Sequence, residues 1–314
     1  MRYRDELIVI VGPTAVGKTA ISIALAERLE AEIVSADSRC LYRGMDIGTA
    51  KPSPEEQARV PHHLIDVTTP DQPWTLAQFQ SAALAAIESV RARGKWALLV
   101  GGTGQYIRAI TEGWQVPPGE PSRELRAELE ATLARDGVGA LAARLREVDP
   151  DSAARVDLRN PRRVIRALEV ALATGESFVA QRRRAAPSFA SLVIGLTLPR
   201  PELYARIDAR VDAMLQAGLV EEVRGLVAKG YGWDLPALSA LGYKQIGQYL
   251  RGECDLLEAV RRIKSATRRF VRRQANWFKP SDPAIRWCDV ARTSVEEIEA
   301  FIRESNQEPP GAKP

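Results

Sequence analysis

The sequence predicts an α/β fold. We expect a P-loop NTPase-like core, with a parallel sheet flanked by helices, and an inserted all-helical domain. Two observations predict it. A glycine loop of the form G-x-x-x-x-G-K-[ST] at 12–19 lies between an apolar run and a segment with helical spacing. Strand-like apolar runs then alternate with helical patterns. A long stretch without such runs follows, and another strand-like run comes after it.

The elements of the core follow one another as a parallel sheet requires. Strands are expected at 7–11, 31–36, 96–100 and 192–198, with a last edge strand at 284–288. Helices are expected at 19–29 and at 76–93, the second ending at the C-cap residue Gly94. Because parallel sheets bind ligands at the carboxyl ends of their strands, the residues that follow these strands are the candidates for a site.

The inserted domain is bounded by a change in pattern. A proline- and glycine-rich connector at 113–122 leads into a helical pattern, in which Asn160-Pro161 marks a helix start. We therefore expect a discontinuous core, 1–115 and 191–304, with basic C-terminal helices, and an inserted helical module at 116–190. The polar tail at 305–314, with three prolines, is expected to be disordered.

Composition limits the class of protein. The chain has 314 residues, 45% of them hydrophobic, and a net charge of only +4, which does not by itself indicate a nucleic-acid partner. Cys40, Cys254 and Cys288 are widely spaced, which favours a reducing cytosol without disulfides or a zinc site. The first apolar run, about five residues, is too short for a signal peptide or a membrane span. We expect a cytoplasmic monomer that makes no contact with membranes.

The glycine loop predicts a phosphate site. Its residues are Gly12, Pro13, Thr14, Ala15, Val16, Gly17, Lys18 and Thr19. The glycines let backbone N–H groups close on phosphate oxygens, and the helix N-terminus adds partial positive charge. Lys18 supplies a point charge, and Thr19 supplies a hydroxyl to Mg²⁺, the cofactor that we expect. Taken alone, the motif suggests a nucleotide such as ATP and leaves the phosphate compound open.

Two other strand ends carry information. Asp37 follows the second strand, where its carboxylate suits a magnesium ligand, a base or a turn residue equally well. The third strand leads into Gly101-Gly102-Thr103-Gly104, without the acid that nucleotidases place there, so a ligand or another backbone can approach closely. No Asn-Lys-x-Asp motif is present, which argues against a switch GTPase.

Basic residues gather in several places. Arg206 and Arg210 share one helix face, where they suit either a phosphate clamp or a solvated surface. The segment 261–273 holds seven cations and no acid, which indicates a polyanion. RNA is favoured over duplex DNA, since no helix-turn-helix or zinc finger is visible. The module adds two basic clusters, one of Arg162, Arg163 and Arg166 and one at 182–184.

The chain resembles the tRNA dimethylallyltransferases, also called tRNA isopentenyltransferases or IPP transferases. The resemblance spans most of the chain, in family order, and the block at 35–52 is far more specific than the P-loop. The segments that carry it are GPTAVGKT (12–19), SADSRCLYRGMDIGTAKP (35–52), PHHLID (61–66), GGTGQYI (101–107), NPRRVIRALEV (160–170), YARIDARVDAML (204–215), LGYKQI (241–246) and TRRFVRRQANWF (267–278).

The resemblance implies a reaction. A dimethylallyl group passes from dimethylallyl diphosphate to N6 of the adenosine on the 3′ side of the anticodon in tRNA, and diphosphate is released. The P-loop would then hold a diphosphate leaving group, with Lys18, Thr19, Mg²⁺ and Arg210 stabilising its developing charge. The resemblance assigns Asp37 as the general base, a role that typically contributes about 10²–10⁴-fold.

The resemblance also implies contacts with the tRNA anticodon stem-loop. They fall on Asp37, Ser38, Arg39, Cys40, Thr103, Arg162, Arg163, Val164, Ile165 and Arg166, and by weaker alignment on Arg126. To these we add Arg268, Arg269, Arg272 and Arg273 of the basic segment. Many members of the family have Met-Gln where this chain has Arg39-Cys40. Because a thiol cannot make the paired hydrogen bonds of an amide, the resemblance does not extend to flanking-base recognition there.

Three other functions remain open on the sequence. A small-molecule kinase using ATP explains the P-loop but not the basic segment. A prenyltransferase acting on free adenylate shares the core but has no need of a basic insertion. A non-catalytic RNA-binding protein with a vestigial P-loop is disfavoured, because Lys18, Thr19 and Asp37 are all present.

Overall fold

The computed structural model describes residues 6–116, 122–180 and 185–306. They form two compact units. The first comprises Met1–Trp74, Gln78–Thr111 and Ser188–Pro314, and the second comprises Thr75–Ala77 and Glu112–Pro187. The predicted basic cluster at 182–184 and most of the predicted disordered tail lie outside the described residues.

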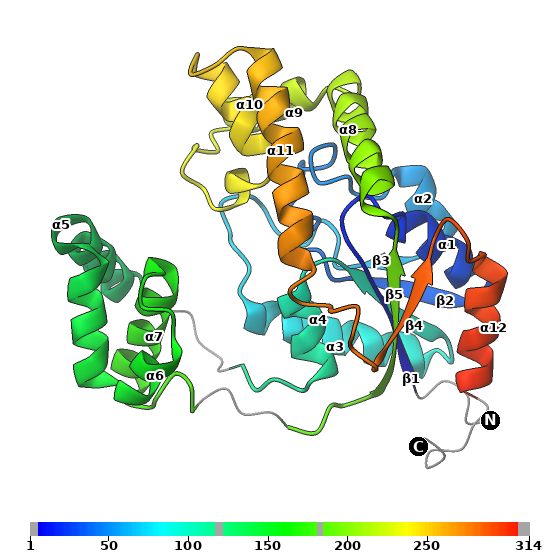
Figure 1. The fold of residues 1–314 in the computed structure, drawn as a ribbon, viewed down its shortest axis with the longest axis horizontal. Coiled ribbons are helices and arrows are strands. Elements are labelled where there is room, and N and C mark those ends of the chain that lie inside the picture. The colour runs from blue at the N-terminus through cyan, green and yellow to red at the C-terminus, as the bar shows by residue number, and fades with distance from the viewer. Residues whose placement is uncertain (1–5, 117–121, 181–184, 307–314) are drawn as a thin grey trace. The chain divides into compact units, whose positions relative to one another are not determined.

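The first unit is built on a six-stranded sheet (Figure 1). Its strand order is β3-β2-β4-β1-β5-β6, and every neighbouring pair is parallel. The strands are β1 (Glu6–Val11), β2 (Ala31–Ser35), β3 (His62–His63), β4 (Trp96–Gly101), β5 (Ala190–Thr197) and β6 (Ile285–Asp289). The predicted α/β class and five predicted strands are confirmed. The sequence missed β3, since two residues are too few to show a period.

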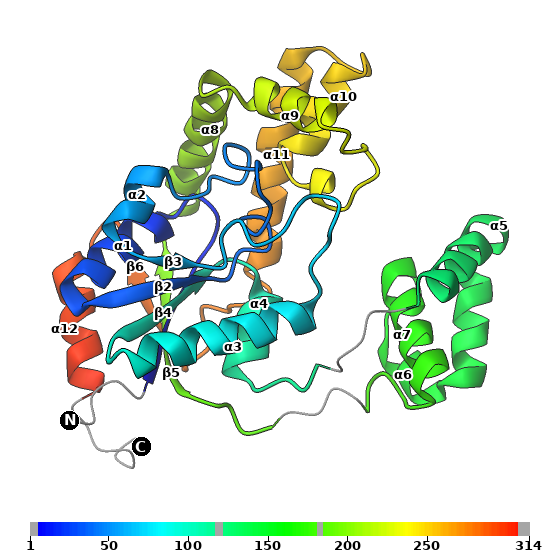
Figure 2. The same ribbon diagram turned by 180° about the vertical axis from the view of Figure 1, so that it is seen from behind.

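Helices cover both faces of this sheet, as Figure 2 shows from behind. The helices of the first unit are α1 (Lys18–Leu29), α2 (Pro54–Arg59), α3 (Leu76–Ala92), α4 (Gly104–Thr111), α8 (Arg200–Gln216), α9 (Leu219–Ala228), η1 (Ala237–Ser239), α10 (Tyr243–Leu250), α11 (Leu256–Gln274) and α12 (Val295–Ser305). Of these, α9, η1 and α10 pack with α11 in a core of their own. Alternate residues of β1, Ile8 and Ile10, share one hydrophobic core with Ile23 of α1 and Ile302 of α12. The residues that alternate with them are buried on the other face of the sheet. Because both faces are buried, the strands read as continuous apolar runs.

The second unit holds the helices α5 (Arg123–Val148), α6 (Pro150–Arg155) and α7 (Pro161–Thr174). The predicted start of α7 is confirmed: Asn160 Oδ1 accepts a hydrogen bond from Arg163 N, and Pro161 is the first helical residue. Gly175, at φ 71°, ends the helix. Leu129, Leu141 and Leu145 of α5 pack against the apolar face of α7 and form a separate core.

Within the described parts of the chain, no helix is both long and apolar enough to cross a membrane.

Candidate active site

A cavity of about 480 Å³ lies where the P-loop follows β1 and β2 gives way to the loop at 37–40. The four predicted catalytic residues, Lys18, Thr19, Asp37 and Arg210, all line it. They come from separate parts of the chain: the start of α1, the end of β2 and the middle of α8. Parallel strands bring their carboxyl ends to one edge, which is why these residues meet.

The P-loop has the backbone that its glycines permit. Gly17, at φ 107°, is left-handed and begins α1. A side chain at Gly12 would place its Cβ 2.7 Å from the carbonyl oxygen of Leu196. The Lys18 ammonium group donates to the carbonyl oxygens of Gly12 and Pro13, at 3.0 and 2.9 Å. Burial lowers the pKa of Lys18 to about 8, against the opposing charge of Asp37.

Arg210 is a cation without a close partner. Its guanidinium makes no hydrogen bond or ion pair with any other described residue, and burial lowers its pKa while the charge of Asp37 opposes that shift. Arg206, one turn earlier, instead donates to the carbonyl oxygen of Val16 at 3.3 Å. Arg206 thus supports the P-loop backbone, whereas Arg210 is available to an anion in the cavity. A desolvated cation without a partner is costly, and a bound anion removes that cost.

The corner beside Asp37 joins two strand ends. Asp37 Oδ1 accepts a hydrogen bond from Arg39 N at 2.9 Å. Thr103 Oγ1 accepts one from Ser38 N at 3.2 Å. A Cβ on Gly101 would lie 2.2 Å from the carbonyl oxygen of Ala36, so the backbone of this corner fills the place where an acidic side chain would otherwise stand. The absent strand-end acid is therefore a packing requirement of this corner.

The two residues that depart from the family pattern have defined surroundings. Arg39 Nη1 donates to the carbonyl oxygen of Pro236 at 3.0 Å, which fixes this side chain beside η1. Cys40 is 5% exposed and lines the cavity. Burial raises the pKa of its thiol, so it stays neutral. Cys40 is thus part of the cavity wall, and RNA can touch its thiol only by entering the cavity.

Magnesium fits this site only in company with a phosphate compound. No group of three or more His, Cys, Asp or Glu residues that could hold a metal occurs among the described residues. Mg²⁺ commonly keeps several waters and takes one or two protein ligands plus substrate phosphates. Thr19 lies next to Lys18 on the cavity wall, and its hydroxyl is suited to be such a protein ligand.

The predicted RNA contacts of the second unit divide into two groups. Arg162 and Arg163 are exposed. Glu169, whose side chain is 1% exposed, holds both Arg126 and Arg166, at 3.2 and 3.4 Å. Arg126 also pairs with Glu130, at 3.0 Å. Four arginines thus remain as candidates for a phosphate backbone.

Two residues predicted to contact RNA in the second unit have buried side chains. Val164 and Ile165 are 0% and 4% exposed and belong to the core of this unit. They lie on the apolar face of α7, so their side chains cannot reach RNA. Helical spacing of the apolar residues in 160–170 was the signal that would have separated them from the arginines.

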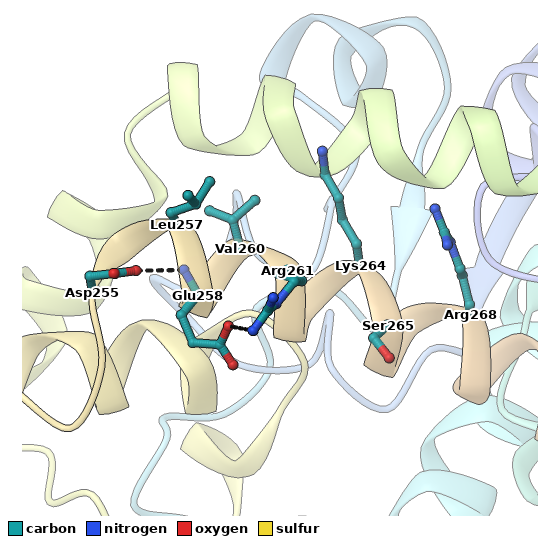
Figure 3. Close-up of a pocket in the computed structure, with 8 residues that line it drawn as sticks. All are labelled: Asp255, Leu257, Glu258, Val260, Arg261, Lys264, Ser265 and Arg268. Carbon is teal, nitrogen blue, oxygen red and sulfur yellow. Dashed lines mark hydrogen bonds and ion pairs between the residues drawn. The ribbon is translucent and has the colours of Figure 1, made fainter.

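The basic helix α11 carries fewer free cations than its sequence suggests. A hollow of about 590 Å³ lies along it. Figure 3 shows the residues that line this hollow: Asp255, Leu257, Glu258, Val260, Arg261, Lys264, Ser265 and Arg268. Glu258 pairs with Arg261 and Arg262. The neighbouring helix α8 supplies the acids that the segment lacks, since Asp212 pairs with Lys264 and Asp208 with Arg268.

Three arginines of α11 make no ion pair with a carboxylate of the described chain: Arg269, Arg272 and Arg273. Their spacing of three and four residues puts them on one face of the helix. Of the four arginines that we predicted as RNA contacts here, Arg268 is therefore engaged with Asp208, and the other three form an unneutralised basic patch.

Comparison with known proteins bears on this site. The family described as IPP transferase matches residues 40–281. A tRNA dimethylallyltransferase of Chloroflexus aurantiacus is 57% identical over 275 residues, which cover 88% of this chain and 93% of that relative. The crystal structure of the full-length tRNA isopentenylpyrophosphate transferase from Bacillus halodurans is 39% identical, with a TM-score of 0.71, over 96% of this chain and 98% of that one.

A eukaryotic dimethylallyltransferase, described as acting on tRNA, is 26% identical with a TM-score of 0.76, over 91% of this chain and 74% of that one. The two solved structures match most of this chain, whereas the family model begins at residue 40, after the P-loop. On the family match and the identity to its curated members, this chain belongs to the IPP transferase family.

Proposed function

We propose that this chain is a tRNA dimethylallyltransferase that moves a dimethylallyl group from dimethylallyl diphosphate to N6 of the adenosine 3′-adjacent to the anticodon, releasing diphosphate. One observation carries the proposal: the unpartnered Arg210, Lys18 of the P-loop and the carboxylate of Asp37 line a single cavity. That arrangement offers cations for a leaving diphosphate and a base for an incoming nucleophile. The names of the relatives point the same way.

The donor half of the cavity suits a diphosphate leaving group. As the allylic C–O bond breaks, its electron pair goes to the diphosphate and positive charge grows on the allylic carbon. Lys18 and Arg210 are placed to stabilise the growing negative charge, and a preorganised cation in a dry site is worth more than one in water. Mg²⁺, held by Thr19 and the diphosphate, would supply further positive charge there.

The acceptor half suits the exocyclic amine of an adenine. This amine is a weak nucleophile because its lone pair is delocalised into the ring. In our proposal N6 forms the bond to the allylic carbon while Asp37 takes the N6 proton, so that charge and atoms balance. Thr103 lies in the same hydrogen-bonded corner, through Ser38 N. The base must leave its stack to enter, as in other enzymes that modify bases.

We further propose that the RNA backbone binds to the basic patch of Arg269, Arg272 and Arg273 and to the arginines of the second unit. Such contacts release counterions, so tRNA affinity should fall steeply as salt is raised. We place the reaction in the cytoplasm and assign it to the monomer. The three cysteines are free in the structure, as a reducing compartment would keep them.

The proposal is tested by incubating purified protein with Mg²⁺, dimethylallyl diphosphate and unmodified tRNA, then measuring the mass of the digested nucleosides. We expect a gain of one C₅H₈ unit on the adenosine beside the anticodon. Parallel reactions with AMP as acceptor, and with ATP in place of the donor, serve as controls. Preferential prenylation of AMP, or phosphoryl transfer from ATP, would refute the assignment.

Replacing Glu169 with glutamine should weaken tRNA binding without touching the chemistry. Glu169 holds Arg126 and Arg166 in place, and a neutral amide holds them less firmly. We expect the KM for tRNA to rise roughly 3–10-fold, equivalent to about 1 kcal/mol. The kcat at saturating tRNA should stay unchanged.

The matched control for Glu169→Gln is Glu130→Gln, which removes only the exposed partner of Arg126. It should leave the KM for tRNA almost unaltered. Thermal unfolding of both variants shows whether the second unit stays folded. Equal KM values for the two variants, both folded, would contradict a positioning role for Glu169.

A further inference from the structure

One buried side chain of α11 bridges the two loops that frame the cavity. Gln274, 7% exposed, ends the helix. Its Oε1 accepts a hydrogen bond from Thr14 N in the P-loop at 3.0 Å, and its Nε2 donates to the carbonyl oxygen of Gly102 at 3.1 Å. A primary amide offers one acceptor and one donor group, so it matches both partners at once. Nothing in the proposed reaction steps uses this residue.

The bridge fixes one peptide unit of the P-loop from both sides. The N–H of the Pro13–Thr14 peptide donates to Gln274, and its carbonyl oxygen accepts from the ammonium group of Lys18 at 2.9 Å. Because a peptide unit is planar, fixing the direction of its N–H also fixes the direction of its carbonyl. Gln274 therefore determines where the carbonyl that holds Lys18 points.

The glycines after β4 make room for this bridge. A Cβ on Gly102 would lie 2.4 Å from Gln274 Nε2, and the next nearest atom would be 3.6 Å away. A Cβ on Gly104 would lie 2.2 Å from Cγ of Trp277. We expected small residues here to admit a ligand or another backbone. The backbone of Ala36 does approach Gly101 closely, whereas at Gly102 and Gly104 the space is occupied by the side chains of Gln274 and Trp277.

We propose that Gln274 is a positioning residue that acts through the Pro13–Thr14 peptide to hold the ammonium group of Lys18 ready for the donor's diphosphate. The inference rests on the proposed function for its substrate, while the bridge itself is independent of it. Arg272 and Arg273 directly precede Gln274, so the same helix end carries the basic patch and the support of the P-loop. Removing the hydrogen bonds of Gln274 should therefore weaken binding of the donor rather than of the tRNA.

The first test measures binding of inorganic diphosphate in the presence of Mg²⁺ by calorimetry, which requires no turnover. Gln274→Met keeps the length of the side chain but removes both hydrogen bonds. We expect diphosphate to bind about tenfold more weakly, the size of effect that losing a buried hydrogen-bonding partner produces. The dissociation constant for tRNA should stay within about twofold of the parent value, since no arginine is altered.

Gln216→Met is the matched control, since Gln216 is exposed on α8 and does not line the cavity. It should bind diphosphate as the parent does. Parent-like diphosphate affinity in Gln274→Met would overturn the inference even if prenylation of tRNA is demonstrated. If tRNA is not prenylated but Gln274→Met still loses diphosphate affinity, the proposed function fails and the positioning role survives.

A double-mutant cycle separates the bridge from a general packing effect. Gly102→Ala should displace the Gln274 side chain, because Nε2 is the one atom that its Cβ would strike. It should therefore weaken diphosphate binding about as much as Gln274→Ala does. In the Gln274→Ala background the clash is gone, so Gly102→Ala should add almost nothing. Fully additive losses would mean that the two residues act separately, and the inference would be wrong.

Discussion

Replacing Asp37 with asparagine is expected to lower kcat for tRNA prenylation about 10²–10⁴-fold, the usual contribution of a positioned general base. Asparagine is nearly the same shape, and its side-chain oxygen can still accept the hydrogen bond from Arg39 N. The corner that Ser38 and Thr103 build should therefore keep its form. What is lost is the group that takes the N6 proton.

Binding measurements distinguish this effect from a loss of substrate. The carboxylate of Asp37 is a negative charge near Lys18 and Arg210, so its removal takes away repulsion of the diphosphate. The bound diphosphate then takes over the part of Asp37 in favouring the charged form of Lys18. Donor affinity should therefore stay equal or rise, and tRNA affinity should hold. Asp71→Asn, at an exposed position, is the matched control. Turnover by Asp37→Asn close to that of Asp71→Asn would rule out the assigned base.

Local sequence was sufficient for most of the fold and for part of the site. Doubly buried strands read as apolar runs, so five of the six strands were predictable. The phosphate loop was predictable because its glycines, Lys18 and Thr19 are contiguous. The short helix α2 was missed although its signal is present: Ser53 and Glu56 form a capping box around Pro54. Helix α2 was therefore predictable from residues 53–56 alone, and the interpretation of the sequence overlooked it.

The rest of the site depends on which faces of distant elements meet. Helical spacing treats Arg206 and Arg210 alike, and only the fold shows that one supports the backbone of Val16 while the other stays unpartnered. Gln274 lies 260 residues from Thr14, and nothing near it in the sequence points to the P-loop. The acid-free segment of α11 looked fully cationic because Asp208 and Asp212 belong to another helix. These contacts join residues that are far apart in the sequence, so the local spacing of residues cannot predict them.

Replacing Lys18 with methionine is expected to reduce kcat/KM for dimethylallyl diphosphate about 10²–10³-fold, as removal of one preorganised group at a developing negative charge typically does. The long apolar side chain fills the same space but supplies no charge to the leaving diphosphate. Steady-state kinetics at saturating tRNA, with the donor varied, measure this loss.

Stability should not explain the loss of activity in Lys18→Met. Burial lowers the pKa of Lys18 from 10.5 to about 8, so the charged lysine is less favourable in the folded protein than in the unfolded chain. This cost to the stability of the native state is full below about pH 8 and disappears as the pH rises to 10.5. Removing the charge should therefore leave the unfolding temperature at neutral pH unchanged or raise it, even though two hydrogen bonds to loop carbonyls are lost. Lys229→Met, at an exposed position after α9, is the matched control. If Lys18→Met kept the kcat/KM of that control while folded, the P-loop would not be the site that stabilises the leaving group.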